Sequence, residues 1–263
     1  MTAGRGPDWV GLAWAGVPLA ACMALLAWRR LGQVRSMAVA TARLVVQMML
    51  LAVVLKGIIA ANHPAVVLAV ALAMLATAAH TVGSRQRRRP WEIRLEAFGA
   101  MAVGAAVAMA VSIRLALRVE PWYDAQTVIP TLGMILGNSV TAVALAAERL
   151  GSDLKADRDL VELRLALGAT ARQAAAPAIR SAVAAGLTPI INNMAIAGIV
   201  AIPGMTTGQL LAGADVGQAI RYQILLYLSI ATTVALSVLI LLAIRSRRYF
   251  TPGHQLRRDA LDG

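Results

Sequence analysis

The sequence is poor in charged, aromatic and cysteine residues, and each shortage excludes a class of protein. Charged residues make up 14% of its 263 residues, whereas a soluble domain usually carries about a quarter. Aromatic residues, at 4%, are too sparse for the stacking platforms of a single-strand binder, so the net charge of +12 does not predict a nucleic-acid partner. Cys22 is the only cysteine, which excludes an intrachain disulfide and a cysteine-based metal cluster.

In place of these residues the sequence has long apolar runs. Hydrophobic residues account for 59% of the chain, and several runs reach about 20 residues, enough to cross a hydrocarbon core about 30 Å thick. We therefore predict an all-α polytopic membrane protein of about seven transmembrane helices, forming a single membrane domain over 1–263 with an insertion at about 149–181. The expected spans are 9–28, 41–61, 64–82, 97–117, 126–148, 182–203 and 220–244.

The basic residues predict the orientation of these spans. Most of the 25 Lys and Arg residues fall in the connections on one side of the expected membrane or in the C-terminal tail, and Arg87-Arg88-Arg89 is the densest run. Because short basic connections stay in the cytoplasm, the sequence predicts an N-terminus outside and a C-terminus inside.

The insertion at 149–181 has the pattern of two helices joined by a sharp elbow. Gly168 suits the C-terminal cap of the first helix, and Thr170 with Gln173 matches a capping box that opens the second. The first helix carries leucines at helical spacing, which are Leu160, Leu163 and Leu167. This stripe fits a loop packed on its own protein, a DNA-reading helix-turn-helix or a docking element for a cytoplasmic partner. We favour docking, because a DNA reader would be fixed between two membrane spans.

The insertion and two other stretches are similar to a known family. Glu162 is followed six residues later by Gly168, with Ala166-Leu167 between them, which resembles the cytoplasmic coupling loop of ABC permeases, although Leu163 and Arg164 stand where that pattern has alanines. Three runs, PTLGMILGNS (130–139), RLALGAT (164–170) and IPGMTTGQLLAG (202–213), resemble signature stretches of the FetB-like ABC transporter permease family. That family includes bacterial iron export permeases and the membrane half of a plant aluminium-tolerance transporter.

The resemblance implies a permease subunit in the cell (inner or plasma) membrane that exports metal ions, with iron suggested. It implies a separate ATP-binding subunit that holds ATP and Mg, and a second copy of the permease in a 2+2 complex in the lipid bilayer. The residues it assigns to ATPase coupling are Glu162, Arg164, Ala166, Leu167, Gly168, Ala169 and Thr170. The lysines agree, because Lys56 precedes glycine and Lys155 precedes alanine, so neither can be a P-loop lysine. We expect no nucleotide site, cofactor or catalytic residue in this chain.

Polar residues within the expected spans are candidates for a translocation path, because polar groups at membrane depth usually face a bundle interior or a water-filled route. These candidates are Gln47, Met134, Asn138, Ser139, Asn192, Asn193 and Met194. The alternative is that the amides join helices by hydrogen bonds worth about 1 kcal/mol each. Glu148 is the only acidic residue that we expect inside a span, so the identity of any metal site is left open.

Two other classes of function compete with an ABC permease. A secondary transporter needs a coupling carboxylate at mid-depth, and none is expected there. A membrane enzyme could use Ser139, but no histidine lies at matching depth to activate it, and the zinc-protease motif His-Glu-x-x-His is absent. Binding of an ATP-binding subunit, with stimulation of its ATPase, separates the permease from both.

Overall fold

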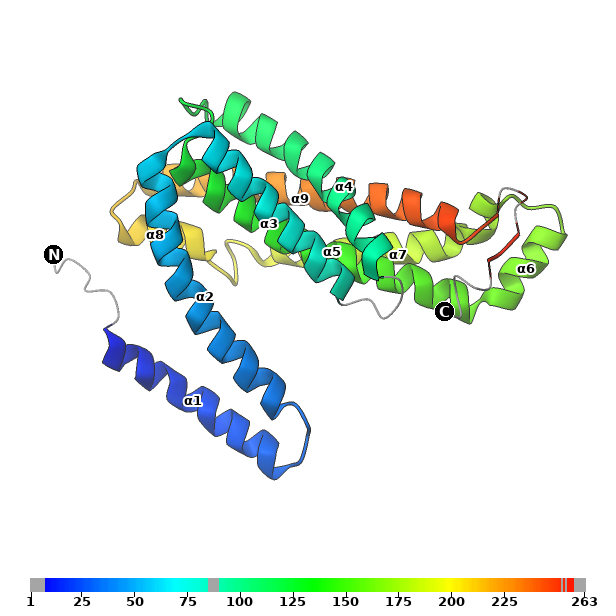
Figure 1. Cartoon of the computed structure of the whole chain (residues 1–263), viewed down its shortest axis with the longest axis horizontal. Helices are drawn as coiled ribbons and strands as arrows, with labels where there is room; N and C mark the ends of the chain where they lie inside the picture. Colours follow the sequence, from blue (N-terminus) through cyan, green and yellow to red (C-terminus); the bar gives the residue numbers. More distant parts are fainter. Residues whose placement is uncertain (1–7, 85–89, 252, 254, 258–263) are drawn as a thin grey trace. The chain divides into compact units, whose positions relative to one another are not determined.

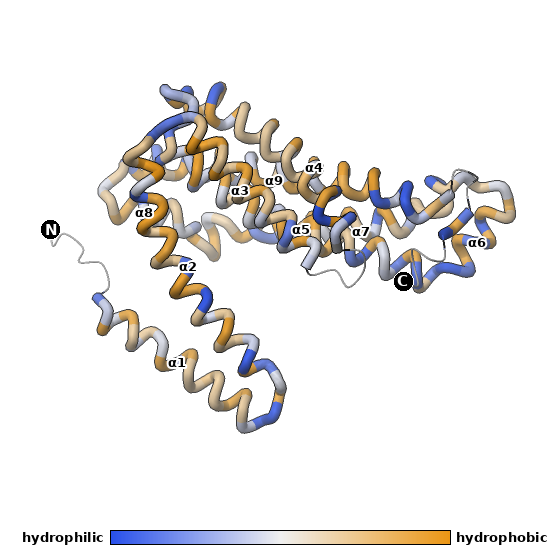
Figure 2. The backbone as a smooth tube through the Cα atoms, in the orientation of Figure 1, coloured by the Kyte–Doolittle hydropathy of each residue, from blue (hydrophilic) through white to orange (hydrophobic). Residues whose placement is uncertain are grey.

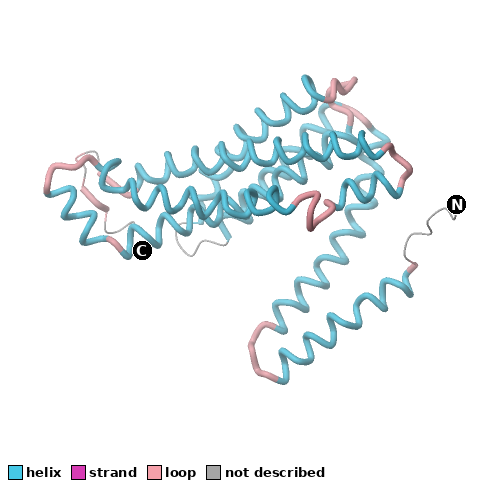
Figure 3. The backbone as a smooth tube through the Cα atoms, turned by 180° about the vertical axis from the view of Figure 1, so that it is seen from behind, coloured by secondary structure: helices cyan, strands magenta, loops and turns pink. Residues whose placement is uncertain are grey.

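The computed structural model describes residues 8–84, 90–251, 253 and 255–257, and this part of the chain consists of helices joined by short loops, with no β-strand (Figures 1 and 3). The Arg87-Arg88-Arg89 run lies outside the described residues. The helices are α1 (Trp9–Trp28), α2 (Val34–Ala61), α3 (Pro64–Ser84), α4 (Pro90–Met109), the π-helical turn η1 (Ala110–Ala116), α5 (Ala125–Ala156), α6 (Arg158–Ala166), α7 (Ala171–Ile196), α8 (Gly204–Leu211) and α9 (Val216–Arg248).

Seven helices in the described part are long and apolar enough to cross a membrane, when η1 is counted as the end of α4. Figure 2 shows that the long helices are mostly apolar along their lengths and that hydrophilic residues gather at turns and helix ends. The prediction of an all-α membrane protein with seven spans is therefore confirmed. The orientation of the termini stays a prediction.

Several helices extend beyond their expected spans. α7 begins at Ala171 instead of 182, α4 begins at Pro90 instead of 97, and α5 ends at Ala156 instead of 148. The apolar stretch ends at the membrane edge, but alanine and charged residues beyond it are good helix formers, so the helix continues. The expected insertion at 149–181 therefore consists of the end of α5, all of α6 and the start of α7.

The chain forms two compact units, one ending at Ala61 and the other beginning at Asn62. The first unit holds α1 and α2, two apolar helices joined by a short turn with Arg30 and Gly32 at positive φ (Figure 1). Asp8 caps α1, with its Oδ1 accepting from the backbone N of Gly11 at 2.7 Å. The sequence prediction of one membrane domain over 1–263 stays a prediction.

The second unit is organised around α9, which packs against α4, α5 and α7. Its fully buried side chains include Met101, Ile135, Leu150, Leu241 and Leu242. α7 begins at the end of the unit where α5 and α9 finish, so α7 and α9 are antiparallel (Figure 1). This end is called the basic end below, because it carries the arginines Arg149, Arg158, Arg164, Arg172, Arg245, Arg247 and Arg248.

α4 and α9 approach each other closely through small and hydroxyl side chains. A Cβ atom on Gly104 would lie 2.8 Å from Oγ of Ser237 and 2.9 Å from the carbonyl oxygen of Thr233. Thr233 Oγ1 donates to the Gly104 carbonyl at 3.2 Å, and Ser237 Oγ donates to the Ala100 carbonyl at 3.3 Å. Glycine is therefore required at 104, and hydroxyl-to-backbone hydrogen bonds close this interface.

At the basic end, Glu96 of α4 forms a buried ion cluster with α9. Its Oε2 lies 3.1 Å from Nη1 of Arg245, and its Oε1 lies 2.7 Å from Nε of Arg248. Nη1 of Arg248 also lies 2.9 Å from Oε2 of Glu92. Glu96 lies one residue before the expected span start at 97, so the expectation about Glu148 as the only acidic residue inside a span stays a prediction. α4 begins earlier than expected, and two arginines compensate the buried carboxylate.

Candidate functional site

A cavity of about 320 Å³ lies between α5 and α7, about midway along α5 and near the end of α7. Its lining is formed by Gly137, Asn138, Thr141 and Ala142 of α5, by Pro189, Ile190 and Asn193 of α7, and by Val234 of α9. Asn138 and Asn193, predicted separately from the sequence, are thus brought to one site. α7 ends at Ile196, one turn beyond Asn193, and irregular backbone with Gly198 at φ 78° follows.

The two asparagines of this cavity make few protein contacts. Nδ2 of Asn138 donates to the Met134 carbonyl at 2.8 Å, a bond within its own helix that holds the amide in place. Within the described residues, Oδ1 of Asn138 and the amide of Asn193 have no hydrogen-bond partner in the protein. Pro189 has no N–H, so the Ala185 carbonyl loses its helical donor. The amides of Asn138 and Asn193, which line the cavity, can therefore bind a polar solute or water.

The chemistry of the cavity is neutral. Its lining offers amides and one threonine hydroxyl, together with apolar side chains and Pro189. No group of three or more His, Cys, Asp or Glu residues that could hold a metal ion occurs in the part of the chain that the structure describes. The arrangement suits weak, reversible coordination by oxygen atoms and contains no acid or base for catalysis.

The other predicted path residues lie outside this cavity. Ser139 is fully buried and its Oγ donates to the Ile135 carbonyl at 2.8 Å. Met134 is half-buried on α5, whereas Asn192 and Met194 are exposed on α7. Gln47 is exposed on α2, in the N-terminal unit. A role for these side chains in transport stays a prediction.

The alternative interpretation requires hydrogen bonds from amide side chains of the spans to other helices. Asn138 bonds to its own helix, whereas Thr233 and Ser237 of α9 donate to backbone carbonyls of α4. One more hydroxyl contact joins η1 to α9, because the hydroxyl oxygens of Ser112 and Ser229 lie 2.6 Å apart. One amide does join two helices, because Oε1 of Gln223 on α9 accepts from Oγ1 of Thr206 on α8 at 3.1 Å. Hydroxyl groups thus bond α9 to α4 and η1, and the choice between a path and helix packing for the predicted amides stays a prediction.

The elbow after α6 has the predicted geometry. Gly168 adopts φ 90°, its N donates to the Leu165 carbonyl, and the N of Ala169 donates to the Arg164 carbonyl, both at 3.0 Å. These are the two hydrogen bonds of a Schellman motif. Thr170 and Gln173 then form a complete capping box at the start of α7. The helix–elbow–helix prediction at Gly168–Thr170 is therefore confirmed.

One side of α6 and the elbow packs against α7, and the other side is exposed. Val161 is 2% exposed, and Nη1 of Arg164 donates to the Ala174 carbonyl of α7 at 3.3 Å. Nε of Arg158 lies 3.3 Å from Oε1 of Glu162 on the same helix. The three leucines of the stripe face outward, with exposed fractions of 44% for Leu160, 55% for Leu163 and 79% for Leu167. Ala166 is also exposed, and Ala169 is half-buried.

The Glu96 cluster is the feature that sequence reasoning missed. Glu92 and Glu96 are four residues apart on α4, and Arg245 and Arg248 are three apart on α9, so each pair occupies one face of its helix. The sequence signal for this cluster was a pair of acidic residues on one helix and a pair of basic residues on another, at the same end of the bundle. The expected span boundary at 97 placed Glu96 outside the membrane and obscured it.

Comparison with known proteins places the chain in a family. Residues 9–250 match the family described as "Uncharacterised protein family (UPF0014)".

The chain is 36% identical to a UPF0014 membrane protein of Synechocystis over 95% of this chain and 96% of the relative. It is 32% identical to the "Probable iron export permease protein FetB" of Escherichia coli over 81% of each chain. It is 34% identical to the UPF0014 membrane protein STAR2 of rice over 78% of this chain and 71% of the relative. No solved structure matches. The resemblance predicted from three sequence runs is confirmed.

Proposed function

The chain belongs to the UPF0014 family of multi-pass membrane proteins, and we propose that it is the permease subunit of an ABC transporter that exports metal ions. A separate ATP-binding subunit holds the ATP and Mg and drives transport through α6 and the elbow. Two permease chains and two ATP-binding chains form the complex in the plasma membrane, with the basic end in the cytoplasm. The orientation follows from the concentration of arginine at that end.

The exposed leucine stripe of α6 is the observation that carries this proposal. Leaving a leucine side chain in water instead of burying it costs about 1.5–3 kcal/mol, and three leucines are exposed here, two on α6 and Leu167 at its C-cap. α6 is not among the helices that are long and apolar enough to cross a membrane. A protein partner that docks at the basic end would bury these leucines, and the elbow would pass the partner's movement to α7.

The proposed cargo is iron or another metal ion, because the E. coli relative is described as a probable iron export permease. The neutral cavity at Asn138 and Asn193 is the proposed passage for it. Amide oxygens bind metal ions weakly, and a transported ion must be released as readily as it is bound. A path of this kind relies on the ATP-binding subunit for its direction.

Gly168→Val tests the coupling role of the elbow. Valine is strained at φ 90°, so the elbow changes shape while the spans stay intact. We expect ATP-driven transport of Fe²⁺ into inverted vesicles to fall by an order of magnitude or more, with ATP hydrolysis by the complex no longer linked to it. Gly213→Val is the matched control, because Gly213 has φ 88° at the opposite end of the unit and should keep coupling. Equal coupling in both variants would reject the docking role.

Asn138→Leu tests the passage. The variant removes the amide oxygen and fills part of the cavity, so we expect transport to fall about tenfold or more while the complex still assembles. Assembly is measured by co-purification of the ATP-binding subunit. Loss of assembly would instead assign Asn138 to helix packing. Transport by a complex without ATP, driven by an ion gradient, would identify a secondary transporter.

A further inference from the structure

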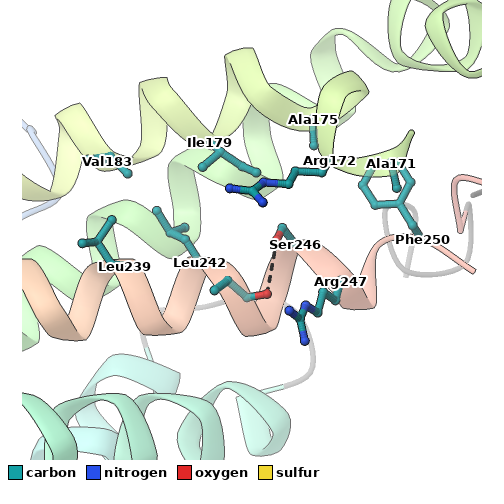
Figure 4. Close-up of a pocket in the computed structure, with 11 residues that line it drawn as sticks. Ala171, Arg172, Ala175, Ile179, Val183, Leu239, Leu242, Ser246, Arg247 and Phe250 are labelled. Atoms are coloured by element: carbon teal, nitrogen blue, oxygen red, sulfur yellow. Dashed lines mark hydrogen bonds between the residues drawn. The ribbon is translucent and has the colours of Figure 1, made fainter. Parts of the chain in front are cut away.

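A second cavity, of about 400 Å³, opens between α7 and α9 at the basic end (Figure 4). We call it the α7–α9 groove, and its main lining residues are Arg172, Ile179 and Val183 of α7, Leu239 and Arg247 of α9, and Phe250 just after α9. Figure 4 shows the guanidinium of Arg172 lying between the two helices, with the Phe250 ring close to the start of α7. The groove shares no lining residue with the Asn138 cavity.

The groove is polar at one end and apolar at the other. α7 and α9 are antiparallel, so Arg172 lies level with Arg247, and Val183 lies level with Leu239. Val183 follows Arg172 by eleven positions, which is roughly 16 Å along a helix axis. The arginines are therefore at the basic end, and the aliphatic side chains lie toward the apolar part of the spans.

The two arginines are available for an anionic ligand. Both are exposed, and within the described residues neither side chain has an ion-pair or hydrogen-bond partner. The groove lining contains no aspartate or glutamate, so no carboxylate competes for them. A guanidinium presents a planar set of donors that matches the oxygens of a phosphate group.

We propose that the α7–α9 groove binds one anionic phospholipid. The headgroup phosphate lies between Arg172 and Arg247, and an acyl chain runs along Val183 and Leu239. A free phosphate ion would use only the basic half of the groove. A zwitterionic lipid would bring its own cation next to the arginines, where no acidic lining residue receives it. Net negative charge on the headgroup is therefore the selected property.

The test uses the purified full-length chain in detergent, titrated with phosphatidylglycerol and with phosphatidylcholine of the same acyl chains. Bound lipid is counted by native mass spectrometry. We expect preference for phosphatidylglycerol, a loss of about fivefold in its association constant for Arg172→Gln, and about thirtyfold for the double variant Arg172→Gln with Arg247→Gln. Arg180→Gln is the matched control, because Arg180 is an exposed arginine of α7 outside the groove lining and should leave binding unchanged.

Ala243→Phe provides a test without a change of charge. Ala243 is exposed and lines the groove, so a phenyl ring there fills the groove and should abolish preferential binding while both arginines remain. The thermal unfolding midpoint of each variant confirms that it is folded. Equal losses for Arg172→Gln and Arg180→Gln, or equal binding of the two lipids, would overturn the proposal. Full competition by inorganic phosphate would identify a phosphate-ion site instead.

Discussion

The α4–α9 and α5–α7 interfaces contain similar residues, but the first is closed and the second opens into a cavity. Both have a glycine at a close approach: a Cβ on Gly104 would lie 2.8 Å from Ser237, and one on Gly186 would lie 3.1 Å from the Ala142 carbonyl. The α4–α9 interface is closed by hydroxyl groups that bond to the facing backbone. The α5–α7 interface closes at Gly186 but opens into a cavity at Asn138.

The difference shows how side-chain hydrogen bonding decides whether a membrane interface is filled. Lipid offers no hydrophobic drive for helix association, so close packing and polar contacts hold helices together. A short hydroxyl side chain reaches the next backbone only when the helices touch. The amide of Asn138 bonds back to Met134, and that of Asn193 bonds to nothing described, so neither draws the helices together. We expect α4 and α9 to move as one body and the α5–α7 cavity to be where shape can change.

Glu96→Gln should have the largest effect on stability, because it removes the negative charge of the ion cluster that joins α4 to α9. The substitution keeps the shape of Glu96 but leaves Arg245, which is 8% exposed, without its carboxylate. We expect the free energy of unfolding to fall by about 3–5 kcal/mol, measured by denaturant unfolding in detergent. Glu148→Gln is the control, because Glu148 is exposed on α5 and its neutralisation should cost less than about 0.5 kcal/mol.

A double variant separates charge from packing at this cluster. Glu96→Leu with Arg245→Met replaces the buried pair by apolar side chains, and Arg248 keeps its contact with Glu92. Most of the lost stability should return, because an apolar pair avoids the desolvation of two charges. If Glu96→Gln were no more destabilising than Glu148→Gln, the cluster would not fix α4 to α9.

Gly104→Ala should have the next largest effect. The added Cβ would meet Ser237 Oγ and the backbone oxygen of Thr233, and backbone cannot move aside as a flexible side chain can. Forcing the helices apart should cost about 1–3 kcal/mol in unfolding free energy. Gly137→Ala is the matched control in the open interface, because a Cβ there meets nothing within 4 Å, and its stability should stay the same or rise. Equal losses in the two variants would remove the contrast between the interfaces.

The sequence predicted the number and type of spans better than their ends. Apolar runs of membrane length allow little except helices, so α1 and α3 were placed almost residue for residue. Hydropathy gave the sixth span a start at 182, eleven residues after α7 begins at Ala171, because hydropathy reports the membrane-crossing part and not the whole helix. The capping box at Thr170 predicted the start of the helix itself. The elbow was predicted closely, since Gly168 and the Thr170–Gln173 capping box act locally and need no tertiary information.

The candidate site was predictable only in part, for a physical reason. The cost of an amide in a span singled out Asn138 and Asn193, but their meeting in one cavity depends on how α5 packs against α7. Ser139, adjacent in sequence to Asn138, points into the core instead. The partner of Glu96 lies 149 residues away along the chain, a separation that no local pattern bridges.

Thr131→Val should have the smallest effect and tests the role of hydroxyl groups most directly. Thr131 of α5 and Thr233 of α9 are both almost fully buried, at 1% and 0% exposed. Oγ1 of Thr131 has no hydrogen-bond partner among the described residues, whereas Oγ1 of Thr233 donates to the carbonyls of Gly104 and Ser229. Valine keeps the shape and removes only the hydroxyl, so Thr131→Val should leave the unfolding free energy unchanged or raise it by about 0.5 kcal/mol. Thr233→Val, the same substitution in the closed interface, should lower it by about 1 kcal/mol. A loss at Thr131 as large as that at Thr233 would mean that burial, and not bonding across the interface, sets the contribution of these hydroxyl groups.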